Sequence, residues 1–145
     1  EFEPEDRQRR DGGDAEFPQS EIYTIKLDGS DPQRVTNSEA NDEEPDWSPD
    51  GSRLVFISKR DDDPNVYTID PDGSNLSQVT ESGIDLSPVW SPDGSRIAYA
   101  ESPDNLDNNY EVLTIKPDGS DGTCVTCSED TALGGPDGEA GLDWK

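Results

Sequence analysis

The sequence predicts an all-β chain built from repeated units of four antiparallel strands. Two observations carry this prediction. The motif WSPDGSR begins at Trp47 and again at Trp90, and an apolar run follows each copy. A further Asp-Gly-Ser motif begins at Asp28, Asp72 and Asp118, each time between two β-prone runs of which the second ends in Val-Thr. A stretch that recurs in register in this way is one structural unit used several times.

The first turn of the unit is Ser48-Pro49-Asp50-Gly51. Proline presets the φ of the first corner residue, Asp tolerates the second corner, and Gly supplies the left-handed residue that a type I turn with a bulge requires. Trp47 precedes this turn and the apolar run 54–57 follows it. The pattern predicts a β-hairpin. We name its strands a (ending near Trp47) and b (53–58).

The second turn of the unit lies around Asp72-Gly73. The β-prone runs 65–69 and 76–80 flank it and predict a second hairpin, with strands c and d. The two Trp motifs are 43 residues apart, and the three c–d turns are 44 and 46 residues apart. A period of about 40–45 residues with four strands is that of a propeller blade.

In chain order, the predicted organisation is two complete β-propeller blades with partial blades at both ends. Residues 1–20 form an irregular lead-in with a weak b strand, and residues 21–46 form a partial c–d blade and a loop. Residues 47–89 form one blade, residues 90–141 form a second blade with a long acidic loop, and residues 142–145 start the next blade.

The order of WSPDG, an apolar strand, IYxxxxDGS and xxxVT resembles the WD40-like β-propeller repeat of the TolB type, from about Arg10 to Trp144. The resemblance implies a binding scaffold that presents loops to a protein or glycan partner, in the periplasm for the TolB family itself. The alternative is a structural subunit of an extracellular assembly or filament, in which other copies complete the broken blades by strand exchange. The size of the particle in solution separates these two functions.

The composition is strongly acidic, with a formal net charge of -24 and 28% hydrophobic residues. Such averages are typical of disordered chains, but here the apolar residues occupy the repeating strand positions. Only 11 Lys and Arg stand against 35 Asp and Glu. This excludes ordinary nucleic-acid binding and disfavours an anionic membrane surface. A salty or calcium-bearing extracellular or periplasmic medium fits such a surface, because salt screens its self-repulsion.

The chain carries no predicted transmembrane stretch and no signal peptide, and it has no Met. We therefore expect a processed chain, or part of a longer one. It has no His, no Gly-x-Ser-x-Gly elbow and no phosphate-binding loop. These absences remove the usual general base, the hydrolase nucleophile and nucleotide cofactors. We expect no enzymatic activity and no cofactor, with calcium as the one exception considered.

Function is expected on the b–c and d–a connections, which emerge opposite the Asp-Gly turns and form the long acidic loops. Asp61, Asp62 and Asp63 lie in one such loop and are a candidate calcium site, because loop carboxylates suit this hard cation. Asn75 begins the glycosylation sequon Asn-Leu-Ser in a turn. Three tryptophans end equivalent a strands and are expected to pack between neighbouring blades: Trp47, Trp90 and Trp144.

Cys124 and Cys127 are the two cysteines of the chain. Without His or further Cys they cannot close a tetrahedral zinc site. In an extended strand, residues i and i+3 lie about 10 Å apart, too far for a disulfide. A bridge therefore requires the chain to turn at Cys127, where strand d should end. An extracellular setting favours this disulfide over the alternative of two free thiols.

Overall fold

The structure, a computed structural model, describes residues 19–81, 83–102 and 110–127. These ranges contain ten β-strands: β1 (Tyr23–Thr24), β2 (Gln33–Arg34), β3 (Asp42–Trp47), β4 (Leu54–Asp61), β5 (Asp63–Ile69), β6 (Ser77–Gln78), β7 (Ile84–Trp90), β8 (Ile97–Ser102), β9 (Glu111–Ile115) and β10 (Thr123–Cys124). Within the same ranges, nothing helical is long and apolar enough to cross a membrane.

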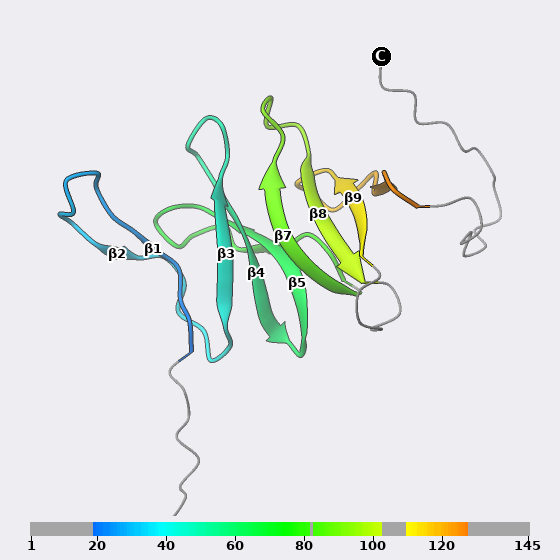
Figure 1. Ribbon diagram of the computed structural model, residues 1–145. Helices are drawn as coiled ribbons and strands as arrows, with labels where there is room; N and C mark the ends of the chain where they lie inside the picture. Colours follow the sequence, from blue (N-terminus) through cyan, green and yellow to red (C-terminus); the bar gives the residue numbers. More distant parts are fainter. Residues whose placement is uncertain (1–18, 82, 103–109, 128–145) are drawn as a thin grey trace, which may run out of the picture.

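The strands pair with their sequence neighbours in three antiparallel sheets, which Figure 1 shows side by side. The first hairpin is β1–β2, blade one is β3-β4-β5-β6, and blade two is β7-β8-β9-β10. The prediction of an all-β fold with four-stranded antiparallel blades is confirmed. The predicted lead-in, most of the long b–c loop of the second blade, the acidic loop 128–141 and the start of a next blade lie outside the described residues.

Strand a extends further back than predicted. Residues 42–46 were assigned to a loop, yet they form most of β3, with Asp42 opposite Ser58 and Glu43 opposite Ile57 on β4. Both a strands contain a register shift, and Glu44 and Ser87 have a positive φ of 55° and 53° at the two shifts. Such a bulge adds one residue to the strand and bends it.

The d strands are shorter than predicted because a threonine hydroxyl replaces the last ladder partner. β6 ends at Gln78, and the Oγ1 of Thr80 accepts the backbone N–H of Val66 at 2.9 Å. Equivalent hydrogen bonds join Ile22 to Thr36 and Val112 to Thr126. The repeated Val-Thr pair thus closes each blade at its outer strand.

The hydrophobic core lies between the sheets. Leu54 and Phe56 of β4 face the first hairpin, where they pack with Ile22 and Val35. The alternate residues of the same strand, Val55 and Ile57, face blade two. They belong to a second cluster that includes Ile97, Tyr99 and Ile115. β4 is therefore apolar on both faces, which explains its continuous Leu-Val-Phe-Ile run.

The c–d turns of the two blades approach the end of the d strand of the preceding unit. A Cβ at Gly73 would lie 2.9 Å from the carbonyl oxygen of Val35, and one at Gly119 would lie 3.0 Å from that of Val79. Both glycines also have a positive φ, of 85° and 81°. Glycine is required here for its conformation and for the close approach of two backbones.

Candidate functional site: a groove between the blades

The a–b and c–d turns of both blades emerge on one face, which we call the turn face. A cavity of about 300 Å³ lies there between the blades, and a second cavity of about 390 Å³ adjoins it. We call the two together the interblade groove. The first cavity is lined by Ser48, Pro49, Asp50, Ser52, Arg53, Trp90, Asp93, Gly94 and Pro117. The second is lined by Arg53, Ser77, Ser95, Lys116, Pro117 and Asp118.

Two aspartates at the rim of the groove are held as anions by their own turns. Asp50 accepts the hydroxyl of Ser48 at 2.7 Å and both the hydroxyl and the backbone N–H of Ser52. These hydrogen bonds, that of the Ser48 hydroxyl foremost, lower the pKa of Asp50 to about 2. Asp93 makes the same contacts with Ser91 and Ser95, and its pKa is lowered to about 2 as well.

Arg53 brings a fixed positive charge into the groove and lines both cavities. Its guanidinium donates to the carbonyl oxygen of Asn75 at 3.2 Å, and its Nε lies 3.5 Å from Oδ1 of Asp70. Arg53 is thus anchored to the c–d turn of its own blade. The matching arginine of blade two, Arg96, is anchored in the same way on Thr114 and Asp121.

The two tryptophans of the described chain are not equivalent, contrary to the expectation from the repeat. Trp90 is half-buried, packs against the core cluster between the blades and lines the groove. Trp47 is 45% exposed. Trp90 meets the a–b turn of the preceding blade, whereas the described residues before Trp47 provide only a c–d hairpin. Trp144 lies outside the described residues.

The acidic b–c loop of blade one does not gather its carboxylates around one point. Asp61 ends β4 and Asp63 begins β5, so the predicted loop is a tight turn in which Asp62 has a φ of 75°. Asp61 accepts a hydrogen bond from the hydroxyl of Tyr67. In the described part of the chain, the three aspartates form no group of ligand atoms close enough to share one ion. Calcium binding there stays a prediction.

A buried ion pair lies beside this turn. Asp42 is buried, and the guanidinium of Arg60 donates to its Oδ1 at 3.0 Å. Arg60 also stacks over the Tyr67 ring, 4.8 Å from its centroid. Burial, together with the hydrogen bond to Asp61, raises the pKa of Tyr67 above its usual range. Tyr67 therefore stays a neutral hydrogen-bond donor.

Blade two carries a buried aspartate at the matching position but without a cation. Asp85 is fully buried and accepts the hydroxyl of Thr80, while its Oδ1 has no hydrogen-bond partner among the described residues. Burial raises the pKa of Asp85 to about 7, and the charge of Glu101 opposite it on β8 adds to the shift. Asp85 was not predicted as a site residue, because the sequence does not show which of its many aspartates are buried.

The remaining predicted site residues lie in the outer strands and turns. Asn75 is exposed in the c–d turn of blade one, and its side-chain amide donates to Asp70 at 2.8 Å. Cys124 and Cys127 form a disulfide with their Cα atoms 5.7 Å apart. The chain bends at Val125 and Thr126, directly after β10, and this bend brings the two sulfurs together.

Function was expected on the face that carries the b–c and d–a connections, yet both cavities of the interblade groove lie on the opposite, turn face. Two of the acidic loops, 104–109 and 128–141, lie outside the described residues. Arg53 was expected only as the first residue of strand b, and Pro117 was not singled out. A signal for Arg53 was present, since an arginine ends both copies of the WSPDGSR motif.

Comparison with known proteins agrees with this architecture. "Protein TolB homolog" of Chlorobium luteolum is 39% identical over 103 residues, which cover 71% of this chain and 23% of that protein. "Tol-Pal system protein TolB" of Syntrophus aciditrophicus is 38% identical over 64 residues, which cover 41% of this chain and 14% of that protein. The chain therefore spans less than a quarter of the length of these relatives.

Among solved structures, the putative TolB of Agrobacterium tumefaciens superposes with a TM-score of 0.66 at 25% identity, over 72% of this chain and 40% of that one. A nidogen/laminin complex and the tricorn protease also match, at 17% and 19% identity, and these two show the fold alone. The family model of the TolB beta propeller domain matches residues 14–138. This chain belongs to the TolB β-propeller domain family.

Proposed function

We propose that this chain is a non-catalytic scaffold outside the cytoplasm that binds a positively charged protein segment in the interblade groove. One observation carries the proposal: a half-buried tryptophan, an anchored arginine and two prolines line a concave surface with two fixed aspartate charges at its rim. Trp and Arg are enriched among residues that dominate binding energy at protein interfaces.

The charge of the chain supports a basic partner. Asp50 and Asp93 stay ionised over the whole range in which proteins are commonly folded, because their pKa values are about 2. The formal net charge of -24 extends this negative field over the molecule. Complementary charge accelerates encounter with a cationic segment and disfavours acidic partners. Arg53 inside the groove then orients the segment, since it repels cationic side chains and attracts carbonyl groups.

The family supports an interaction role and a setting outside the cytoplasm. Two relatives are a "Tol-Pal system protein TolB" and a "Protein TolB homolog"; the first name refers to a system of proteins, and neither names a reaction. Peptidases and lyases also occur among the fold neighbours, at 20% identity or less, and show the fold alone. The absence of His from the chain argues against general-base catalysis of the usual kind.

The test is selection of binders from a phage-displayed peptide library, followed by affinity measurement on the free peptides. We expect enriched peptides to carry Lys or Arg and to bind less well to Arg53→Ala, Pro49→Ala and Asp50→Asn. Arg96→Ala is the matched control, because Arg96 has the same place in the repeat and does not line the groove. A glycan array provides the second arm. Peptides that bind both arginine variants equally would contradict the groove as the binding site.

A structural role is the second candidate, and a different observation favours it. The outward face of the first hairpin exposes Tyr23, Ile25 and Leu27, which are 58%, 61% and 109% exposed. Apolar side chains in a row on a short hairpin are a surface that other strands can cover. Another copy of the chain that covers this face would make a structural subunit of an assembly or filament.

A further inference from the structure

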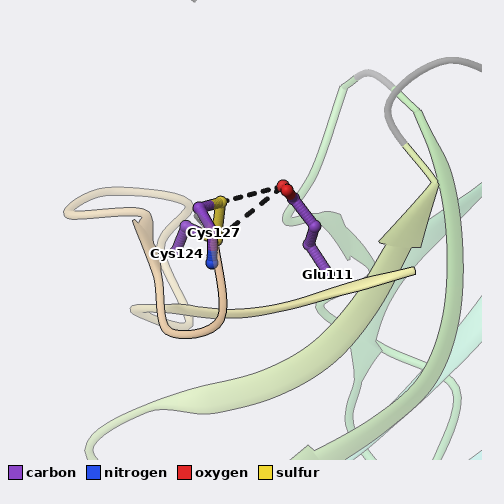
Figure 2. A group of neighbouring side chains, drawn as sticks. All are labelled: Glu111, Cys124 and Cys127. Atoms are coloured by element: carbon purple, nitrogen blue, oxygen red, sulfur yellow. Dashed lines mark hydrogen bonds between the residues drawn. A yellow bond between two sulfur atoms is a disulfide. The ribbon is translucent and has the colours of Figure 1, made fainter. Parts of the chain in front are cut away.

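Glu111, Cys124 and Cys127 form a cluster on the outer edge of blade two (Figure 2). Glu111 is the first residue of β9, and Cys124 is the last residue of β10, the strand paired with β9. Oε2 of Glu111 lies 2.8 Å from Sγ of Cys127 and 3.8 Å from Sγ of Cys124. The three potential ligand atoms all lie within 4.8 Å of one another.

We propose that this cluster is a redox-gated site for a thiophilic divalent cation such as Zn²⁺, closed by the Cys124–Cys127 disulfide and opened by its reduction. The proposal is independent of the interblade groove and of the scaffold function. It adds Glu111 to the two cysteines, which by themselves offer too few ligands for zinc.

The oxidised form does not explain the approach of Glu111. The sulfurs of a disulfide carry no hydrogen, so Sγ of Cys127 cannot donate a hydrogen bond to the carboxylate oxygen 2.8 Å away. A thiol in the reduced form would donate a hydrogen bond to this oxygen, and a cation would bind both groups at once. The position of Glu111 therefore suits the reduced, metal-binding form better than the disulfide.

The distances suit a tetrahedral zinc site. With Zn–S of about 2.3 Å and Zn–O of about 2.0 Å, neighbouring ligand atoms lie about 3.5–3.8 Å apart. The Cys124–Glu111 separation of 3.8 Å already has this length. The Cys127–Glu111 separation of 2.8 Å has to lengthen by less than about 1 Å. The two sulfurs have to move apart, which they do once their bond is broken.

Two further features favour the reduced site. The backbone N–H of Cys127 donates to Sγ of Cys124 at 3.0 Å. The sulfur of Cys124 can accept the same N–H when it binds a metal ion. Cys127 is exposed, and Cys124 and Glu111 are half-buried, so both a reductant and a cation reach the cluster from solvent. Two thiolates and one carboxylate leave a fourth coordination position for water.

Reduction of the Cys124–Cys127 disulfide by a dithiol is a two-electron exchange. A dithiol reductant attacks one sulfur as its thiolate, forms a mixed disulfide and releases the other cysteine; its second thiol then resolves the mixed disulfide. The reductant loses two electrons and becomes a disulfide, and Cys124 and Cys127 gain the two electrons and two protons. Binding of Zn²⁺ then displaces these two protons into solvent.

The test measures Zn²⁺ binding to the full chain in its oxidised form and after reduction by a phosphine, which binds zinc weakly. Excess calcium and NaCl are added so that zinc does not bind unspecifically to the surface carboxylates. A chromogenic chelator competes with the chain for zinc and reports the amount bound. We expect one Zn²⁺ per reduced chain and none per oxidised chain at the same zinc concentration. Co²⁺ in place of zinc should give the thiolate-to-metal absorption band of a sulfur-ligated site.

The variants locate the ligands. Cys124→Ser should abolish the Co²⁺ band, and Glu111→Gln should weaken zinc binding by about 10–100-fold, at least as much as loss of an outer-shell partner costs. Glu39→Gln, which changes an exposed glutamate in the loop before β3, should leave binding unchanged. Equal zinc binding by oxidised and reduced chains, or by Glu111→Gln and the unchanged chain, would overturn the proposal.

Reduction by itself can loosen blade two, so circular dichroism of the reduced, zinc-free chain is recorded first. If reduction unfolds the blade, added zinc should restore the spectrum of the unchanged chain but not that of Glu111→Gln. Restoration in both, or in neither, would overturn the proposal equally.

Discussion

The carboxylate of Glu44 accepts a hydrogen bond from the backbone N–H of Ser87, 43 residues further along the chain, at 2.6 Å. The two residues occupy the same place in successive repeats, since each lies at the bulge of its a strand with positive φ. Asp46 makes a parallel contact, in which its Oδ2 accepts the backbone N–H of Trp90 at 2.9 Å. Acidic side chains of one a strand thus bind the backbone of the next and fix the spacing of the blades.

We expect Asp46→Ala to lower the free energy of unfolding by about 1–3 kcal/mol, because it leaves the half-buried N–H of Trp90 without its charged acceptor. Glu44→Ala should cost less, since Ser87 is exposed and water replaces the lost acceptor. Glu81→Ala, at an exposed residue before β7, is the control and should change stability by less than about 0.5 kcal/mol. Urea unfolding followed by tryptophan fluorescence measures all three. Equal effects of Asp46→Ala and Glu81→Ala would show that the contact adds nothing.

The unequal burial of the tryptophans makes a second prediction. Trp90→Ala should lower the free energy of unfolding by about 3 kcal/mol, because it removes an aromatic ring from the cluster between the blades. Trp47→Ala should cost about 1 kcal/mol or less, because that ring is 45% exposed. Chemical unfolding monitored by circular dichroism at low protein concentration tests this. A loss at Trp47 as large as that at Trp90 would mean that another chain covers Trp47 in solution.

Buried Asp85 predicts a dependence of stability on pH. Its pKa is raised from 3.8 to about 7 in the folded chain, chiefly by burial. Between these two pH values the folded state holds a proton that the unfolded state has lost, so stability falls as pH rises through this window. The slope from this one group is at most about 1.4 kcal/mol per pH unit. Asp85→Asn should remove it and stabilise the chain at pH 8.

The matched control for Asp85 is Asp42, at the same place in blade one. Asp42 is paired with Arg60, so Asp42→Asn should lower stability by about 2 kcal/mol and leave the slope between pH 4 and 7 in place. Thermal unfolding of the three proteins at a series of pH values gives the answer. If stability falls with pH equally steeply in Asp85→Asn and in the unchanged chain, another group causes the pH dependence.

Most of the fold was predictable because its signals are local. A Pro-Asp-Gly turn needs particular residues at particular corners, so the repeated turns located the hairpins and the period gave the blade. Strand β3 was predicted too short because residues 42–46 are four acidic residues and a proline, which are rare in strands. Those residues are extended because they pair with β4. Such backbone pairing does not depend on apolar side chains, so a charged segment gives no pattern from which a strand can be predicted.

The candidate sites were less predictable because they depend on how the units stack. Arg53 and Pro117 are 64 residues apart and meet only because blade two packs against the turns of blade one. Glu111 reaches the cysteines through the register of one hairpin, with Cys124 opposite Leu113. The disulfide depended on where the chain turns. The sequence indicated a strand end at Cys127, whereas β10 ends at Cys124 and the bend lies between the two cysteines.

The last prediction concerns the exposed face of the first hairpin. Gly73 and Gly119 each lie against a Val carbonyl oxygen of the preceding unit, but a Cβ at Gly29 would meet nothing within 4 Å. Tyr23, on the same hairpin, is also exposed. Gly29 therefore has the same turn conformation as Gly73 and Gly119, with φ of 81°, but its surface is uncovered. We expect this chain by itself not to be a folded monomer. A second copy is expected to cover this face of the hairpin, as blade one covers the matching face of blade two, where Gly119 lies against Val79.

Three glycine variants separate folding from association. Gly73→Ala and Gly119→Ala should each lower the free energy of unfolding by at least about 1–2 kcal/mol, since the new Cβ meets both an unfavourable φ and a carbonyl oxygen. Gly29→Ala meets no carbonyl oxygen within the chain, so its added effect should appear as weaker association.

Light scattering over a range of protein concentrations measures the mass of each variant. If the unchanged chain is a monodisperse monomer that melts cooperatively, the hairpin needs no cover and the prediction is wrong. If it associates and Gly29→Ala associates equally well, the hairpin face is not the contact.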